Sequence, residues 1–126
     1  MYRSFKQMPV WQRAMDIAER VHKLTESLPK REDYGFTSQI RRSSLSIPAN
    51  IAEAFGRKHI LEKVNFYLIA KGSLTETLSH LEYGRRVKYF ADNQSFELET
   101  TLGELFNELD KVILALKRAK ARTSRP

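Results

Sequence analysis

The chain has 126 residues, with 22 lysines and arginines against 15 aspartates and glutamates, which gives a formal net charge of +7. That length fits one domain with a core of its own, and the absence of cysteine excludes a disulfide framework, a thiolate nucleophile and a thiolate metal site. No apolar run approaches the roughly 20 residues of a membrane span, and the first residues lack the apolar core of a signal peptide, so we expect a cytoplasmic protein.

The first predicted helix covers residues 9–28. Pro9 suits its first turn, because the backbone N–H that proline lacks would have no intrahelical partner there. Pro29 and the charged residues 30–33 end the helix. Its apolar side chains recur every three or four positions, which is the spacing of one helix face. They are Val10, Ala14, Ile17, Val21, Leu24 and Leu28.

The second predicted helix covers residues 34–55 and contains a proline. Pro48 removes one backbone donor and clashes with the carbonyl of Ser44, which costs about 3 kcal/mol in an ordinary helix interior. We therefore expect a kinked core helix that its packing holds in place. Gly56 stops it, because glycine adopts the left-handed conformation at little cost. Its apolar face comprises Ile40, Ile47 and Ile51.

The third predicted helix, residues 60–90, is apolar on two faces. A helix with such a wide apolar surface is buried on more than one side. One face carries Leu61, Val64 and Leu68, and the other carries Tyr67, Ala70, Leu74, Leu78 and Leu81. The fourth predicted helix, residues 95–120, has a near-heptad apolar seam suited to bundle packing. This seam comprises Leu98, Leu102, Leu105, Leu109, Ile113 and Leu116.

Charge is segregated along the fourth helix. Residues 92–110 include six acids and no base, whereas residues 111–126 include six bases and no acid. The helix dipole favours this polarity by a few tenths of a kcal/mol per charge, roughly, near the helix ends. It does not require six cations. We expect residues 121–126 to form a flexible basic tail.

These segments predict an all-α fold. The pattern contains no strand-like alternation and no repeats, and every connection is short. Short connections between long helices favour antiparallel neighbours, so we expect residues 1–126 to form one domain, an up-down four-helix bundle.

That topology predicts a basic end of the bundle, where the start of the third helix meets the end of the fourth. The candidate nucleic-acid-binding residues there are Arg57, Lys58, Lys63, Lys117, Arg118, Lys120 and Arg122. By the same argument Arg85, Arg86 and Lys88 lie near the acidic half of the fourth helix and are partly neutralised. The alternative interpretation is that the bases serve solubility and scattered ion pairs.

No catalytic or metal-binding pattern stands out. His22, His59 and His80 lie on different predicted elements without the i, i+4 spacing of a helical metal site. Glu53 and Glu76 lack the Glu-x-x-His motifs of a di-metal bundle. We therefore expect no catalytic residues, no metal and no cofactor, and we expect Asn50, Glu53 and Glu76 to make polar contacts within or between subunits.

Four segments together resemble the bacterial "four helix bundle protein" family, which includes proteins encoded in intervening sequences of large-subunit ribosomal RNA genes. The segments are Phe5 with Val10–Ala14, Leu28–Pro29 with Glu32–Phe36, Gln39–Glu53, and Ile69–Leu78. The motif and packing residues are Gln39, Arg41, Arg42, Ser46, Pro48, Asn50, Glu53, Gly72, Ser73 and Glu76. The sequence departs from the family at Ala54, where a glycine is usual.

The resemblance implies a cyclic homopentamer of four-helix bundles. One related group is the accessory variability determinant (Avd) of diversity-generating retroelements, whose basic barrels bind RNA and a partner reverse transcriptase. We therefore predict a non-enzymatic, RNA-binding homo-oligomeric scaffold, the Avd-like subunit of such a complex. The alternatives are an rRNA intervening-sequence protein of unknown function, and a protein-binding adaptor without nucleic-acid binding. Gene neighbourhood separates the first two interpretations.

Overall fold

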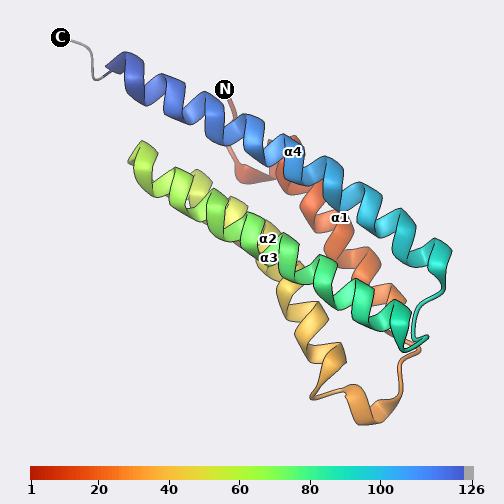
Figure 1. The fold of residues 1–126 in the computed structure, drawn as a ribbon. Helices are drawn as coiled ribbons and strands as arrows, with labels where there is room; N and C mark the ends of the chain where they lie inside the picture. Colours follow the sequence, from red (N-terminus) through yellow and green to blue (C-terminus); the bar gives the residue numbers. More distant parts are fainter. Residues whose placement is uncertain (124–126) are drawn as a thin grey trace.

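Four long helices form an up-down bundle in the computed structural model, which describes residues 1–123. The helices are α1 (Pro9–Leu24), α2 (Phe36–Gly56), α3 (Ile60–Arg86) and α4 (Asp92–Thr123), with the short 3₁₀ helices η1 (Phe5–Gln7) and η2 (Lys30–Glu32) before α1 and α2. Consecutive helices run in opposite directions (Figure 1). The predicted all-α, up-down architecture is therefore confirmed. Within residues 1–123, no helix combines the length and apolar composition that a membrane crossing requires.

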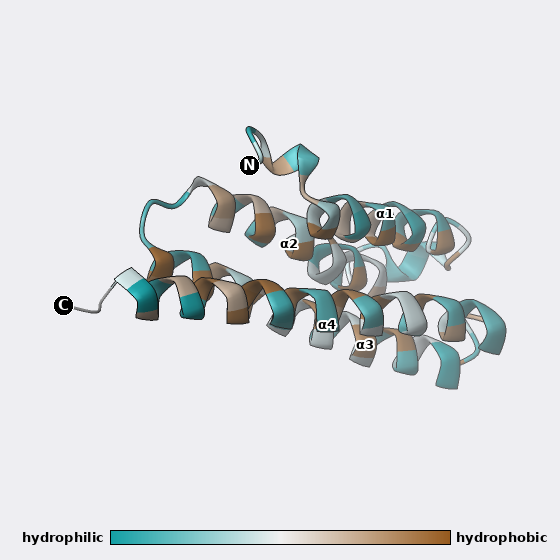
Figure 2. Cartoon of the chain, turned by 90° about the horizontal axis from the view of Figure 1, so that it is seen from above, coloured by the Kyte–Doolittle hydropathy of each residue, from teal (hydrophilic) through white to brown (hydrophobic). Residues whose placement is uncertain are grey.

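All four helices contribute to one core. Apolar and hydrophilic residues alternate along each helix, as amphipathic helices require (Figure 2). Of the two faces predicted for α3, one is buried, whereas the other is buried only at Val64 and leaves Leu61 and Leu68 exposed. The largest fully buried apolar side chains are Ile17, Val21, Ile40, Ile47, Ile51, Leu74, Leu81, Leu102, Leu105 and Leu109.

Helix α1 ends at Leu24, four residues before its predicted end. The buried Thr25 hydroxyl lies 2.8 Å from the Val21 carbonyl and donates to it. Arg41 of α2 adds a donor from Nη2 to the His22 carbonyl at 3.2 Å. These side chains add donors to carbonyls of the last turn of α1, where backbone donors run out.

Helix α3 ends at Arg86, four residues before its predicted end, in a turn that closes on Gly84. Lys88 adopts a left-handed backbone with φ of 67°, and the Tyr89 N–H donates to the Gly84 carbonyl at 2.8 Å. This arrangement is a Schellman turn. It folds the ring of Phe90 onto Gly84, where a Cβ atom would overlap the ring.

Helix α4 is longer at both ends than the sequence pattern predicts. It begins at Asp92 and continues to Thr123. The expected flexible tail is therefore corrected for residues 121–123, which are helical, and residues 124–126 lie outside the described part. The last core contact of α4 is the partly buried Leu116, so about two turns at 3.6 residues per turn extend past the packed core.

Candidate nucleic-acid interface

Exposed bases gather on the final turns of α4. Lys117, Arg118, Lys120 and Arg122 are all exposed, and none makes an ion pair with the described residues 1–123. These four residues are the α4 basic segment. The sixth base of this run, Arg125, lies outside the described residues.

The α4 basic segment and the α2–α3 connection lie at the same end of the bundle, as predicted from the topology (Figures 1 and 2). The connection carries Lys58, which is exposed and makes no ion pair within the described chain. It also carries Arg57, which is shared between Glu53 and Glu62 at 3.8 Å each. The Arg57 guanidinium carbon lies 4.6 Å from the centre of the Phe66 ring. Arg57 is thus partly neutralised and held against an aromatic ring.

Lys63 has a structural role. Its ammonium donates to the Ala54 carbonyl at 3.2 Å and to the Phe55 carbonyl at 3.0 Å. These are carbonyls of the last turn of α2, where the Ala54 carbonyl also accepts from the Arg57 N–H at 3.3 Å. Lys63 therefore caps a neighbouring helix, and it is the member of the predicted set least available to a phosphate. Sequence spacing did not reveal this contact, because donor and acceptors lie on different helices.

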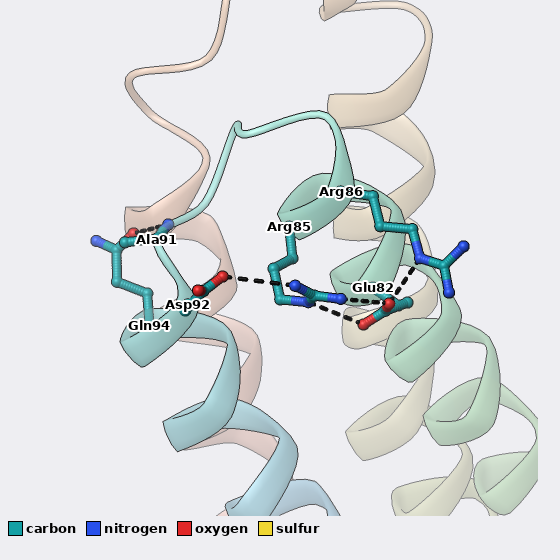
Figure 3. Close-up of polar contacts among 6 residues, drawn as sticks. All are labelled: Glu82, Arg85, Arg86, Ala91, Asp92 and Gln94. Atoms are coloured by element: carbon teal, nitrogen blue, oxygen red, sulfur yellow. Dashed lines mark hydrogen bonds and ion pairs between the residues drawn. The ribbon is translucent and has the colours of Figure 1, made fainter.

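At the other end of the bundle, Arg85 and Arg86 form ion pairs, mainly with Glu82 of α3 itself, whereas the exposed Lys88 makes no ion pair within residues 1–123. Arg85 contacts Glu82 at 2.8 Å and Asp92 at 3.5 Å, and Arg86 contacts Glu82 at 2.7 Å (Figure 3). Hydrogen bonds from Arg85 and Arg86 lower the pKa of Glu82 to about 2. Gln94 accepts a hydrogen bond from the Ala91 N–H at 3.0 Å next to the first turn of α4 (Figure 3). Arg85 and Arg86 are therefore largely neutralised by carboxylates of the chain itself.

The serine and asparagine residues of the family motif form a polar seam between α2 and α3. Asn50 Nδ2 donates to the Ser46 carbonyl at 2.8 Å, and the Ser73 hydroxyl contacts the Ser46 hydroxyl at 2.9 Å. One turn further along, the fully buried Thr77 contacts the Ser43 hydroxyl at 2.9 Å. Hydroxyl pairs of this kind fix the register of two helices, because each buried polar atom requires its partner.

The charged motif residues serve local structure. Arg41 Nε donates to the Thr25 hydroxyl at 2.8 Å at the end of α1. Glu53 contacts Arg57, and Glu76 lies 3.4 Å from His80 one turn away on α3. Asn50, Glu53 and Glu76 thus each make a polar contact within the subunit. The remaining polar motif residues, Gln39 and Arg42, are exposed or half-buried.

Pro48 and Gly72 behave differently from each other. Helix α2 continues through Pro48, which is buried, so packing does hold the proline in a helix. Gly72 is exposed, and a Cβ atom there would meet nothing within 4 Å. No other helix of the same subunit therefore approaches closely at Gly72. The close approach occurs at Gly84, which the motif did not include.

No metal cluster forms among residues 1–123, where no group of three or more His, Cys, Asp or Glu side chains is placed to hold an ion.

The fold and its charges define a small all-α bundle protein with one basic end. The model of the 23S rRNA-intervening sequence protein family matches residues 6–111, and the chain belongs to this family. A solved structure of a protein of unknown function from the S23 ribosomal protein family of Bacteroides thetaiotaomicron is similar, with 26% identity and a TM-score of 0.74. The match covers 82% of this chain and 97% of that one. None of the curated proteins matches.

The family match ends at residue 111, before the α4 basic segment. Residues 112–123 of α4 follow the last matched position. Membership of the family therefore accounts for the bundle and its motif residues, while the charge of the α4 basic segment is a property of this chain outside the matched region.

Proposed function

We propose that this protein is a non-enzymatic scaffold that binds RNA through the basic end of its bundle. The observation that carries the proposal is the α4 basic segment, whose four bases are exposed and unpaired within residues 1–123. Lys58 and Arg57 extend the surface across the neighbouring connection. Lys63 is withdrawn from the proposed RNA-binding residues because it caps α2.

The segment suits phosphate contacts without base recognition. Lysine and arginine side chains on a projecting helix meet the backbone of an RNA strand, and phosphate contacts carry no sequence information. Residues 117–122 span about 8 Å along the axis, at a rise of 1.5 Å per residue. One subunit thus reaches only one or two phosphates, and several subunits in an assembly would add their contacts on one strand.

Family membership favours the rRNA intervening-sequence interpretation over the more specific Avd interpretation. The role as accessory subunit of a retroelement reverse transcriptase stays a prediction that the resemblance implies. A reverse transcriptase gene beside this one would support it, and a location inside a ribosomal RNA gene would contradict it. RNA binding at the basic end is compatible with either genomic setting.

We expect the purified protein to bind single-stranded RNA with little sequence preference and with strong salt dependence. Each phosphate neutralised on a single strand contributes about −0.7 to the slope of log affinity against log salt. Fluorescence anisotropy with labelled oligo-U and oligo-A, from low to high salt, measures this slope. Binding that does not weaken with salt contradicts a phosphate surface. If the protein binds no RNA even at low salt, a protein-binding adaptor becomes the favoured function.

We also propose a closed homo-oligomer, with a pentamer as the expected form. The exposed side chains of Leu61 and Leu68 lie on the same stripe of α3 as Gly72, at intervals of seven and four residues. Light scattering is expected to give a multiple of 14.7 kDa. Gly72→Leu should lower that mass while the subunit stays folded, since a side chain there meets open space within the subunit. A wild-type monomer at micromolar concentration would contradict the assembly.

A further inference from the structure

A polar and aromatic pocket opens at the end of the bundle opposite the α4 basic segment. Its volume is about 340 Å³, and its walls come from η2, the first turns of α2 and the second half of α3. No lysine or arginine is among its lining residues. The lining residues are Glu32, Phe36, Gln39, Ser79, His80 and Tyr83.

Glu32 supplies a fixed negative charge to this pocket. Its Oε2 accepts a hydrogen bond from the Tyr89 hydroxyl at 2.6 Å, and its Oε1 accepts one from the Phe36 N–H at 3.4 Å. The Tyr89 hydrogen bond is the main cause that lowers the pKa of Glu32, so the carboxylate is ionised at neutral pH. Arg31 lowers this pKa as well, without an ion pair to Glu32. Each carboxylate oxygen keeps acceptor capacity for a further donor.

Two aromatic rings, those of Phe36 and Tyr83, line the pocket together with Glu32. The ring centres of Phe36 and Tyr83 lie 5.1 Å apart, and those of Phe36 and Tyr89 lie 5.9 Å apart. Tyr83 is 49% exposed, so a ligand in the pocket can reach its ring. The face of an aromatic ring attracts a cation, and planar cations also stack on it.

The remaining walls offer hydrogen-bond acceptors. His80 Nε2 is buried and has no hydrogen-bond partner among the described residues, although Glu76 lies 3.4 Å away. The Glu76 carboxylate beside Nε2 favours a proton on that nitrogen, so the acceptors of these walls are the hydroxyl of Ser79 and the amide oxygen of Gln39. The pocket thus combines one negative charge, aromatic faces and several acceptors.

We propose that this pocket binds the guanidinium group of an arginine side chain presented by a protein partner. A guanidinium is planar, permanently charged and carries five N–H donors, which match a carboxylate, an aromatic face and neighbouring acceptors together. A nucleotide fits less well, because no lysine or arginine lines the pocket to hold its phosphate and the Glu32 carboxylate repels it. This surface is independent of the RNA proposal and lies at the other end of the bundle.

The test is a titration of the full-length, isotope-labelled chain with N-acetyl-L-arginine amide, followed by TROSY spectra. N-acetyl-L-citrulline amide is the matched probe, because it has nearly the same shape without the charge. We expect arginine to shift the signals of Phe36, Gln39, His80 and Tyr83, and citrulline to bind about tenfold more weakly, the effect of losing one charge-assisted hydrogen bond. Equal affinity for the two probes would overturn the proposal.

Two variants with the same change of charge locate the effect. Glu32→Gln keeps an acceptor for Tyr89 and should weaken arginine binding about tenfold. The adjacent Asp33→Asn removes an exposed carboxylate that does not line the pocket, and should change the affinity less than about twofold, as a screened surface charge does. Equal losses in both variants would show general charge attraction and overturn the proposal.

A second pocket variant and a measurement of oligomer mass test the proposal further. Tyr83→Ala removes an exposed ring, so it keeps the proposal testable if Glu32→Gln fails to fold, and it should weaken arginine binding as well. The oligomer mass of Glu32→Gln should equal that of the wild type. A lower mass would show that Glu32 holds the oligomer together. The arginine would then come from a second copy of this chain, and the proposal of a different protein partner would be overturned. Shifts of the same signals by oligo-U would also overturn it, in favour of a nucleobase.

Discussion

Gly84→Ala is expected to lower the free energy of unfolding by about 2–3 kcal/mol, although alanine is the better helix former. A methyl group at this position overlaps the ring of Phe90, which is only 3% exposed. The ring must leave the core, or the Schellman turn that carries it must shift. Either change loses buried apolar area. It also strains the end of α3, where the left-handed backbone of Lys88 already costs conformational free energy.

The matched control is Gly103→Ala in the middle of α4. Gly103 is exposed, and a Cβ atom there meets nothing within 4 Å. This substitution should raise the free energy of unfolding by up to about 1 kcal/mol, because only helix propensity changes. Urea denaturation at one protein concentration compares the two variants with the wild type. A Gly84→Ala protein as stable as the wild type would contradict the close contact with Phe90.

The two glycines of α3 illustrate what a single sequence reveals. Gly72 stands out in the sequence because it belongs to the family motif. Gly84 lies next to the end of α3, but the helical spacing of apolar residues continues past it and gives no sign of a turn. The helical periodicity continues to Phe90, so the pattern places the helix end four residues late. Gly84 is needed because the ring of Phe90, six residues later, folds back onto it. The spacing of apolar residues does not indicate this contact.

Helix number, order and direction could be predicted from periodicity and short connections, because they depend on local pattern. The ends of the helices depend on side chains from elsewhere. Arg41 reaches from α2 to the end of α1, and Lys63 reaches from α3 to the end of α2. Such caps decide both where a helix stops and which bases remain free, so the sequence predicted the basic end but not the withdrawal of Lys63.

The acidic and basic halves of α4 could also be anticipated, because antiparallel packing converts a position along the chain into an end of the bundle. The proposed guanidinium-binding pocket could not be predicted from the sequence. Glu32, Gln39 and Tyr83 lie on three different elements, and each has an ordinary surface role when considered alone. Only the fold brings the carboxylate and the rings together.

Reversal of Lys117, Arg118 and Lys120 to glutamate should have the largest effect on RNA binding. The triple variant replaces three exposed cations by anions on every subunit, so it both removes phosphate contacts and repels the strand. We expect affinity to fall about 100-fold at low salt, and the salt slope to become shallower by about 0.7 for each phosphate that the protein no longer neutralises. Helical signal and oligomer mass should stay unchanged, because these side chains make no ion pair within residues 1–123.

The control must change net charge equally without touching the surface. Arg85 and Arg86 are unsuitable, because their reversal breaks ion pairs with Glu82 and Asp92 and so disturbs folding. Reversal of the exposed Lys23, Lys30 and Arg42 avoids this problem, since none of them makes an ion pair within the described residues. Each set removes six units of charge, which takes the formal net charge from +7 to +1.

The two triple variants separate a local surface from the long-range field of the protein. A field effect depends on net charge and is screened within about 10 Å at 0.1 M salt. The two variants would then lose affinity equally, and the loss would vanish in salt. A contact surface predicts that the control keeps its salt slope and most of its affinity, while the α4 variant loses both. Equal losses would therefore contradict the placement of the RNA surface, and no loss in either variant would assign the basic end to a partner other than nucleic acid.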